Sequence, residues 1–381
     1  MGWRGISILV LCWLMSWQVQ SLDLTSVNLS YQYDLTVPMQ FAHRVVSSES
    51  GVKVFFKVEG DSLVKWRMDL LVQPSYASLA HDTLRAYTID TLVNTSKELF
   101  LGITFDPLQN AVLLITMAQL EIGVYLLEDI QIGKQTGFSS VYPKDIKGLP
   151  ILEPYITSNN ISFSGADSLH VYEYTDNFES ADPPMGLMRM ISPSLDIDTS
   201  YYFDSQLPSF KEYRFYLIQQ DTLSQEALTI LKCPPYFPEY KSILELVDPL
   251  TYITTSEEIK SMTDGYSKKA FEQFWIGTFS TKFRAKNAIK LYYDRIEKAN
   301  QLFTDYKQGW KTDRGMLYIV FGPPDVVKRD ERTETWTYRD GYEFEFIRIS
   351  TLFAPLMYSL KRNRRYENLW YQQVGEIRKG L

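Results

Sequence analysis

The chain has 381 residues, of which 45% are hydrophobic and 14% aromatic, and its formal net charge is −7 at pH 7. This length suits two or three domains, and the apolar fraction excludes a chain that is disordered throughout. Residues 241–381 hold 24 Lys and Arg against 19 Asp and Glu, so the remainder of the chain is acidic. That small positive excess does not indicate nucleic-acid binding, and we expect no nucleic-acid partner.

Residues 1–21 have the features of a secretory signal peptide. Arg4 supplies a positive start, Ile6 to Trp17 form an apolar run, and Val19-Gln20-Ser21 resembles a small-residue cleavage site. The apolar run is shorter than the roughly 20 residues that a membrane-spanning helix needs. An uncleaved membrane anchor is the alternative interpretation. We expect cleavage after Ser21, export, and no transmembrane span in the mature chain.

Two all-β modules are predicted next, at residues 22–147 and 148–238. Short β-branched and aromatic runs separated by turn residues are typical of immunoglobulin-like sandwiches. In the first module the expected strands are Val52–Val58, Trp66–Val72, Leu99–Phe105, Ala111–Met117 and Gly123–Ile132. In the second they are His170–Tyr174, Leu187–Ile191, Tyr213–Gln219 and Ala227–Leu231.

Cysteine and histidine are scarce. Once a signal peptide is removed only Cys233 remains, so an intrachain disulfide is impossible, and we interpret this thiol as an inert linker residue. All three histidines, His43, His81 and His170, lie in the β modules. Residues 239–381 therefore have no His or Cys and no ligand spacing typical of zinc. We expect neither a metal nor a cofactor.

Residues 239–381 are predicted to form an α+β domain with a helical entry and an antiparallel sheet. The prolines of Cys233–Pro238 mark the boundary, because proline cannot continue strand pairing. Thr255 and Glu258 have the spacing of a helix capping box. A long helix is expected from Lys282 to Phe303, with its apolar residues at helical spacing.

The stretch Gly309-Trp310-Lys311-Thr312-Asp313-Arg314-Gly315 follows this helix and is rich in residues that cap and turn a chain. We expect Gly309 to end the helix and Met316–Phe321 to form an apolar strand. Trp310 would anchor the turn in the core, while Thr312 and Asp313 accept backbone N–H bonds. Arg314 would pair with Asp313 or Asp325, and Gly315 would permit a close backbone approach.

The following residues predict a rigid turn and a hairpin. Gly322, Pro324 and Asp325 belong to the turn, because Pro324 holds the residue before it in an extended conformation. Strands from Glu334 to Tyr338, which include Trp336, and from Tyr342 to Ile349 would pair across Asp340-Gly341. Near the C-terminus, a basic cluster precedes an amphipathic helix, and its candidate interaction residues are Arg362, Arg364, Arg365 and Trp370.

The motif and its surroundings resemble the GWxTD-domain family of bacterial envelope proteins, known from Bacteroidota and related lineages. The resemblance runs from about Leu244 to the C-terminus. It includes the helical residues Phe271–Trp275, Tyr292, Arg295, Ala299, Asn300 and Phe303, and the downstream residues Gly322, Pro324, Asp325, Trp336 and Tyr338. It implies an α+β architecture and an address in the cell envelope, but no particular reaction.

We therefore expect a non-catalytic scaffold or accessory binding protein of an envelope export or assembly machine. It would lie in the periplasm or peripheral to the outer membrane, with envelope proteins as partners, for which an outer-membrane barrel complex is one candidate. The alternative is an envelope glycan or peptidoglycan hydrolase that uses the carboxylates of Asp313 and Asp325. A structural turn, an interaction surface and a catalytic site are thus the three interpretations of the motif, and we favour the structural turn.

Overall fold

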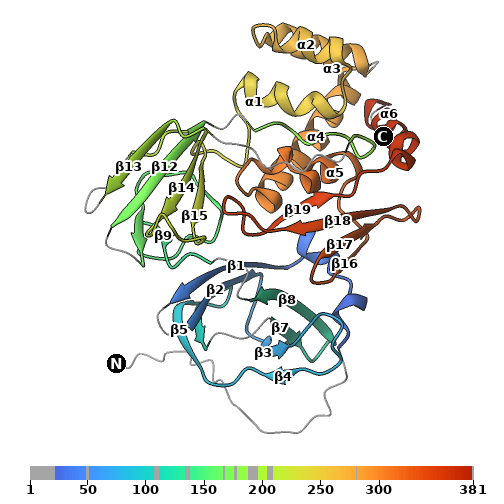
Figure 1. Cartoon of the computed structure of the whole chain (residues 1–381). Coiled ribbons are helices and arrows are strands. Elements are labelled where there is room, and N and C mark those ends of the chain that lie inside the picture. Colours follow the sequence, from blue (N-terminus) through green and yellow to red (C-terminus); the bar gives the residue numbers. More distant parts are fainter. Residues whose placement is uncertain are drawn as a thin grey trace, which may run out of the picture.

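The structure is a computed structural model of the whole chain (Figure 1), and it describes nine segments. These are residues 22–48, 51–106, 111–133, 138–165, 168–175, 178–187, 196–203, 209–279 and 281–379. The expected signal peptide and most of the expected strand Leu187–Ile191 lie outside the described residues. Among the helices in these segments, none is long and apolar enough to cross a membrane.

The first β unit consists of two four-stranded antiparallel sheets. One has the order β1 (Met39–Ser48), β2 (Gly51–Gly60), β6 (Glu98–Phe105), β5 (Tyr87–Asn94). The other has the order β4 (Asp82–Thr83), β3 (Arg67–Gln73), β7 (Ala111–Gln119), β8 (Val124–Ile132). Alternate residues such as Val54 and Phe56 of β2 meet Leu113 and Ile115 of β7 in one core. This arrangement confirms the five expected strands.

The second β unit differs from the expected two-sheet sandwich. Its main sheet has five strands in the order β10 (Tyr155–Ile156), β15 (Leu228–Lys232), β14 (Arg214–Gln219), β12 (Leu169–Thr175), β13 (Thr199–Phe203), and β9 (Tyr142–Lys144) pairs separately with β11 (Ser162–Ser164). In β14, Tyr216 and Ile218 face one core, and Phe215 and Leu217 face another that also holds Tyr306 from the C-terminal domain. The second face of this sheet is therefore covered by a distant segment of the chain.

Helices dominate the start of the region that the sequence predicts as a C-terminal domain, residues 239–381, which is called the C-terminal domain below. They are α1 (Ile243–Val247), η3 (Asp248–Tyr252), α2 (Ser256–Thr263), α3 (Lys268–Thr278), α4 (Lys282–Phe303), η4 (Gly309–Lys311) and α5 (Asp313–Phe321), while η5 (Arg364–Tyr366) and α6 (Glu367–Lys379) lie near the C-terminus. The capping box of Thr255 and Glu258 is present, and α4 has the expected bounds. Its apolar stripe, which includes Tyr292 and Phe303, is buried.

The expected strand at Met316–Phe321 is wrong, because this segment is the C-terminal two-thirds of helix α5. Thr312 caps the helix by accepting a hydrogen bond from the Gly315 N–H, and Gly322, with φ of +83°, ends it. The residues from Met316 to Val320 are all buried, so the helix has no polar face to reveal its period. A short continuous apolar run cannot be assigned to a strand or a buried helix by periodicity alone.

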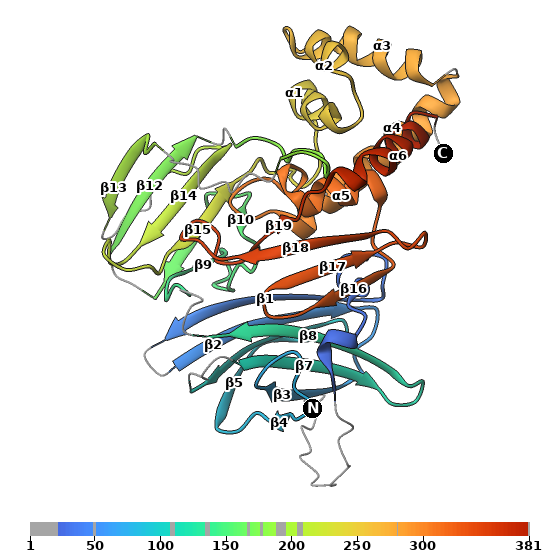
Figure 2. The same ribbon diagram turned by 45° about the vertical axis from the view of Figure 1, so that its right-hand side comes forward.

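A four-stranded antiparallel meander completes the C-terminal domain. Its strands pair in chain order: β16 (Val326–Arg329), β17 (Thr333–Thr337), β18 (Glu343–Ile349) and β19 (Met357–Leu360). The Asp340-Gly341 turn is confirmed, with φ of +76° at Gly341. Phe344 and Phe346 are fully buried. Figure 2 shows this sheet between α4, α5 and α6 on one side and the first β unit on the other.

Two short 3₁₀ helices, η1 (Leu24–Ser26) and η2 (Ser30–Tyr33), precede the first sandwich and lie against the C-terminal sheet. The Leu29 N–H donates to the carbonyl of Val327 in β16 at 2.8 Å. The ring of Tyr33 packs on Phe303 of α4 and on Trp336 of β17, with centroids 5.4 and 5.3 Å away. The start of the described chain is therefore part of the C-terminal core.

Candidate functional site

The two outer glycines of the motif permit a backbone contact that no other residue would allow. A Cβ atom on Gly309 would lie 2.0 Å from the carbonyl oxygen of Ala299, and one on Gly315 would lie 1.9 Å from that of Gly309. Gly309 therefore does not end the long helix, as the sequence suggested, because α4 already ends at Phe303. It lets η4 pack directly against the backbone of α4.

Polar side chains hold this close packing together. The Trp310 N–H donates to Asn300 Oδ1 at 3.1 Å, and the Gly309 N–H donates to Thr304 Oγ1 at 2.9 Å. The Thr312 hydroxyl donates to the Gly309 carbonyl at 2.7 Å and accepts from the Gly315 N–H at 3.0 Å. Trp310 is buried and its indole N–H donates to Gln308. The expected roles of Trp310 and Thr312 are confirmed.

Asp313 connects the motif to the end of the C-terminal sheet. Its Oδ2 accepts the Leu360 N–H at 2.7 Å, and its Oδ1 lies 2.5 Å from Arg362 Nη2. The same guanidinium donates to the carbonyl of Asp182 in the second β unit at 3.0 Å. The side chain of Arg362 is only 6% exposed, so it points inward and does not join the exposed basic residues around it.

The expected ion partner of Arg314 is also wrong. Asp313 pairs with Arg362, and Asp325 pairs with Arg339 at 2.9 Å on the exposed hairpin turn. The guanidinium of Arg314 instead lies over the ring of Tyr358, 4.2 Å from its centroid, and donates to the Tyr33 hydroxyl at 3.1 Å. Sequence distance hid these partners, because each lies in another segment of the chain.

Arg314 borders a buried charge network centred on Arg329. The Arg329 guanidinium binds both oxygens of Asp129, at 2.7 and 2.8 Å, and lies 2.7 Å from a Glu334 oxygen. It also donates to the Tyr33 hydroxyl, which in turn donates to Glu334. Asp129 comes from β8 of the first sandwich, whereas Arg329 and Glu334 come from the C-terminal sheet. The network thus joins two parts of the molecule, and no local pattern in the sequence indicated it.

The network holds both carboxyl groups in their charged form. Burial by itself would raise the pKa of Asp129, but the positive charge of Arg329 and hydrogen bonds from Tyr76, Arg329 and Gln32 outweigh it and lower that pKa below its ordinary value. Burial likewise opposes ionisation of Glu334, and Arg329, Arg314 and Tyr33 together lower the pKa of Glu334. Burial raises the pKa of Tyr33 far above its ordinary range, so its hydroxyl stays protonated as a donor.

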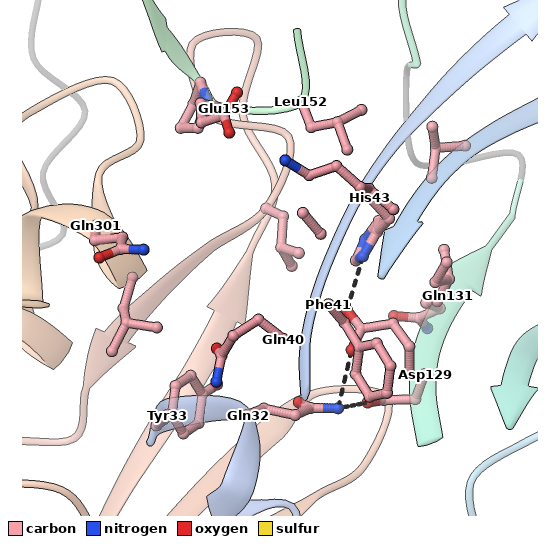
Figure 3. Close-up of a pocket in the computed structure, with 18 of the residues that line it drawn as sticks. Gln32, Tyr33, Gln40, Phe41, His43, Asp129, Gln131, Leu152, Glu153 and Gln301 are labelled. Carbon is pink, nitrogen blue, oxygen red and sulfur yellow. Dashed lines mark hydrogen bonds and ion pairs between the residues drawn. The ribbon is translucent and has the colours of Figure 1, made fainter. Parts of the chain in front are cut away.

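A cavity of about 420 Å³ opens beside this network, between β1 and β8 of the first sandwich, the 152–155 segment and the C-terminal domain. His43 Nδ1 lies 2.8 Å from a Glu128 oxygen there. Figure 3 shows the Gln32 amide directed at Asp129, with Gln301 on the opposite side. The residues that line the cavity include both cationic and anionic side chains. Within the described segments, no group of three or more His, Cys, Asp or Glu is arranged to hold a metal.

The remaining candidate residues are structural or exposed. Pro324 is buried in the turn after α5, and the Tyr338 hydroxyl donates to the Gly322 carbonyl at 3.1 Å. The Trp336 indole donates to Glu334. Arg364 and Arg365 are exposed as expected. Trp370, a candidate interaction residue from the sequence, is buried against Tyr252 and Phe321 and so packs inside the protein.

The comparison with protein families agrees with the motif. Residues 214–379 match the sequence model of the GWxTD domain, and the match begins at the first residue of β14. The match therefore includes β14 and β15 of the five-stranded sheet. It begins earlier in the chain than the start near Leu244 that the sequence led us to expect. No curated protein matches the sequence. Residues 214–379 of the chain are thus similar to the GWxTD domain, as the motif at residues 309–315 led us to expect.

Proposed function

We propose that this protein is a non-catalytic scaffold or accessory binding protein of the bacterial cell envelope. It would work on the periplasmic side of the outer membrane, within an export or assembly machine. The carrying observation is that the charged residues of the motif bind other parts of the same chain. Asp313 is occupied by Leu360 and Arg362, and Arg314 by Tyr33 and the ring of Tyr358.

A hydrolase that used the two motif carboxylates would need them to face a shared cleft with oxygens accessible to substrate. Asp313 is partly buried at the junction of α5 and β19, where its side chain is 12% exposed, whereas Asp325 is paired with an arginine that is 90% exposed on the hairpin turn. Neither carboxylate lines the 420 Å³ cavity. These placements favour the structural interpretation of the motif over the hydrolase alternative.

The way the parts are joined also supports a scaffold. Arg329 and Asp129 connect the C-terminal domain to the first sandwich, and Arg362 connects the motif to Asp182 of the second β unit. Buried charge pairs accept little change in geometry, because separating them leaves unpaired charges in the interior. We infer that the two β units present their outer surfaces to partners in a fixed orientation.

Affinity purification of the full-length chain from detergent-solubilised envelopes, followed by mass spectrometry, tests this proposal. We expect a defined set of envelope proteins, and a mature N-terminus at Leu22. The Asp325→Asn variant should recover the same set, because that carboxylate has no catalytic task. If the chain digests peptidoglycan or soluble glycans and Asp325→Asn abolishes digestion without changing the melting temperature, the scaffold proposal is wrong and the hydrolase is favoured.

A further inference from the structure

The corner between α3 and α4 is unusual in a chain with net negative charge. From Gln273 to Tyr293 the sequence contains no Asp or Glu, whereas it contains Lys282, Arg284, Lys286 and Lys290. All four cationic residues are exposed. We call the described residues of 276–291 the α3–α4 corner. Its positive charge is therefore concentrated within the first turns of one helix.

Large apolar side chains are exposed at the same corner. Phe283 is 73% exposed and Ile276 is 53% exposed. The buried side of the corner is filled by other aromatic rings. Trp275 stacks on Phe279 with ring centroids 5.4 Å apart and also packs on Tyr292. The core of the corner is thus complete without Phe283 and Ile276. The exposed ring of Phe283 therefore adds little to the stability of the fold, and its position in solvent suggests a contact with another molecule.

The cations of the corner have no internal partner in the described part of the chain. Lys282, Arg284, Lys286 and Lys290 form no ion pair there, although lysines nearby do. Lys298 lies 2.9 Å from Asp294, and Lys268 lies 3.8 Å from Glu272, each one helical turn away. The corner cations therefore remain available to an anion outside the protein.

The shape of the corner limits which anionic partner fits. Figures 1 and 2 show α2, α3 and the first part of α4 extending away from the β-sheets. The corner is a projection, and the 420 Å³ cavity lies elsewhere, at the first sandwich. An acidic protein helix usually docks in a groove. A projecting edge with single bulky apolar residues among lysines fits a broad, deformable anionic surface better.

We propose that the α3–α4 corner binds the anionic head groups of a lipid bilayer. Lys282, Arg284, Lys286 and Lys290 contact lipid phosphates, and Phe283 and Ile276 enter the interface between head groups and acyl chains. The long lysine side chains keep their ammonium groups at the phosphates while their methylene stems cover apolar surface. This inference deepens the proposed function, since it supplies the contact that would hold the scaffold at a membrane.

Sedimentation of the full-length mature chain with vesicles tests the proposal. Vesicles of phosphatidylcholine alone are compared with vesicles that also contain phosphatidylglycerol, at low and high salt. We expect binding only to the anionic vesicles, and loss of that binding at high salt. The double variant Lys286→Glu/Lys290→Glu should bind at least about tenfold more weakly, because each cation near an anionic surface adds to affinity.

Control variants with the same change at other exposed sites show whether binding depends on the α3–α4 corner or only on the overall charge and hydrophobicity of the protein. Lys97→Glu/Lys147→Glu makes the same charge change at exposed sites of the β units, Lys97 in the first and Lys147 in the second, and it should bind nearly as well as the parent. Phe283→Ser should weaken binding several-fold, whereas Leu223→Ser, at a residue 92% exposed in the second β unit, should not. Unchanged circular dichroism and melting temperature show that each variant is folded.

Three results would overturn the proposal: no preference for anionic vesicles, equal losses in the corner and control variants, or binding that salt leaves unchanged. If vesicles are not bound but soluble polyglutamate is, in a manner that needs Lys286 and Lys290, then the corner binds an acidic protein and the lipid assignment is wrong. Failure to bind lipid would leave the scaffold proposal standing, since purified lipid vesicles contain no envelope proteins.

Discussion

The C-terminal domain joins the two β units by different means. Toward the first sandwich the contact is a buried charge network, in which Arg329 binds Asp129 and Glu334. Toward the second β unit, besides the hydrogen bond from Arg362 to the Asp182 carbonyl, it is a cluster of rings, in which Phe178 packs against Tyr306 and Phe215 packs against Phe353. Charge pairs specify one geometry and fail when one partner is lost, whereas apolar packing is tolerant of small changes. The first contact should therefore determine orientation, and the second should mainly add stability.

Breaking the charge network should have the largest effect. Arg329→Met leaves Asp129 buried without its cation and leaves Glu334 with only Arg314, 3.7 Å away, and we expect a loss of about 3–5 kcal/mol in the free energy of unfolding. Urea unfolding of the full chain measures it. The control is Arg339→Met at the exposed pair with Asp325, which should cost less than about 1 kcal/mol. Equal effects of the two substitutions would contradict the distinction between buried and exposed pairs.

As pH falls, the charge network around Arg329 should weaken before the ring cluster around Tyr306 does. The folded-state pKa values of Asp129 and Glu334 lie below their ordinary values of 3.8 and 4.5. A lowered pKa contributes stability that is present above the unfolded-state pKa and lost as pH falls toward the folded-state pKa. Stability of the parent should thus fall steeply below about pH 4. In Arg329→Met this source of acid sensitivity should be largely absent, which chemical denaturation at several pH values would reveal.

Substitution in the ring cluster should have a moderate effect. Phe215→Leu removes ring contacts with Phe178 and Phe353 but keeps an apolar side chain, so we expect a cost of about 1–1.5 kcal/mol. Because no charge is involved, the cost should be the same at low and high salt and between pH 5 and 8. A cost that changes strongly with pH would mean that the second contact also depends on a titrating group.

Asp305 lies beside the ring cluster, next to Tyr306. Its pKa is shifted upward, whereas the pKa values of Asp129 and Glu334 are shifted downward, so its effect on stability changes with pH in the opposite direction. Burial raises the pKa of its carboxyl group to about 6. The charged form is thus disfavoured in the folded protein, and Asp305→Asn should stabilise it at pH 7 by roughly 1–2 kcal/mol, allowing for partial exposure. The gain should shrink as pH falls from 6 to about 4, where the parent becomes protonated. If Asp305→Asn still stabilises the protein at pH 4, the stabilisation does not come from the raised pKa of Asp305.

The sequence predicted elements whose signals are local. The capping box at Thr255, the bounds of α4 and the Asp340-Gly341 hairpin each depend on residues a few positions apart. It failed for α5, because a helix buried on every side has no amphipathic period. It also failed for the partners of Arg314 and Asp313. Tyr33, Tyr358 and Arg362 are brought to the motif by the tertiary fold, and single-sequence spacing carries no information about them.

The central claim is that Asp313 of the motif is a structural partner of Arg362, and a double-mutant cycle tests it most directly. Asp313→Asn, Arg362→Gln and the double variant are unfolded with urea as full-length chains. Asp313→Asn loses a charge-assisted acceptor and should cost about 1.5–3 kcal/mol. The double variant should cost clearly less than the sum of the two single variants, because each single change leaves the other charge unpaired. If Asp313→Asn is as stable as the parent and the cycle shows no coupling, the motif is not the internal junction described and Asp313 must serve a site.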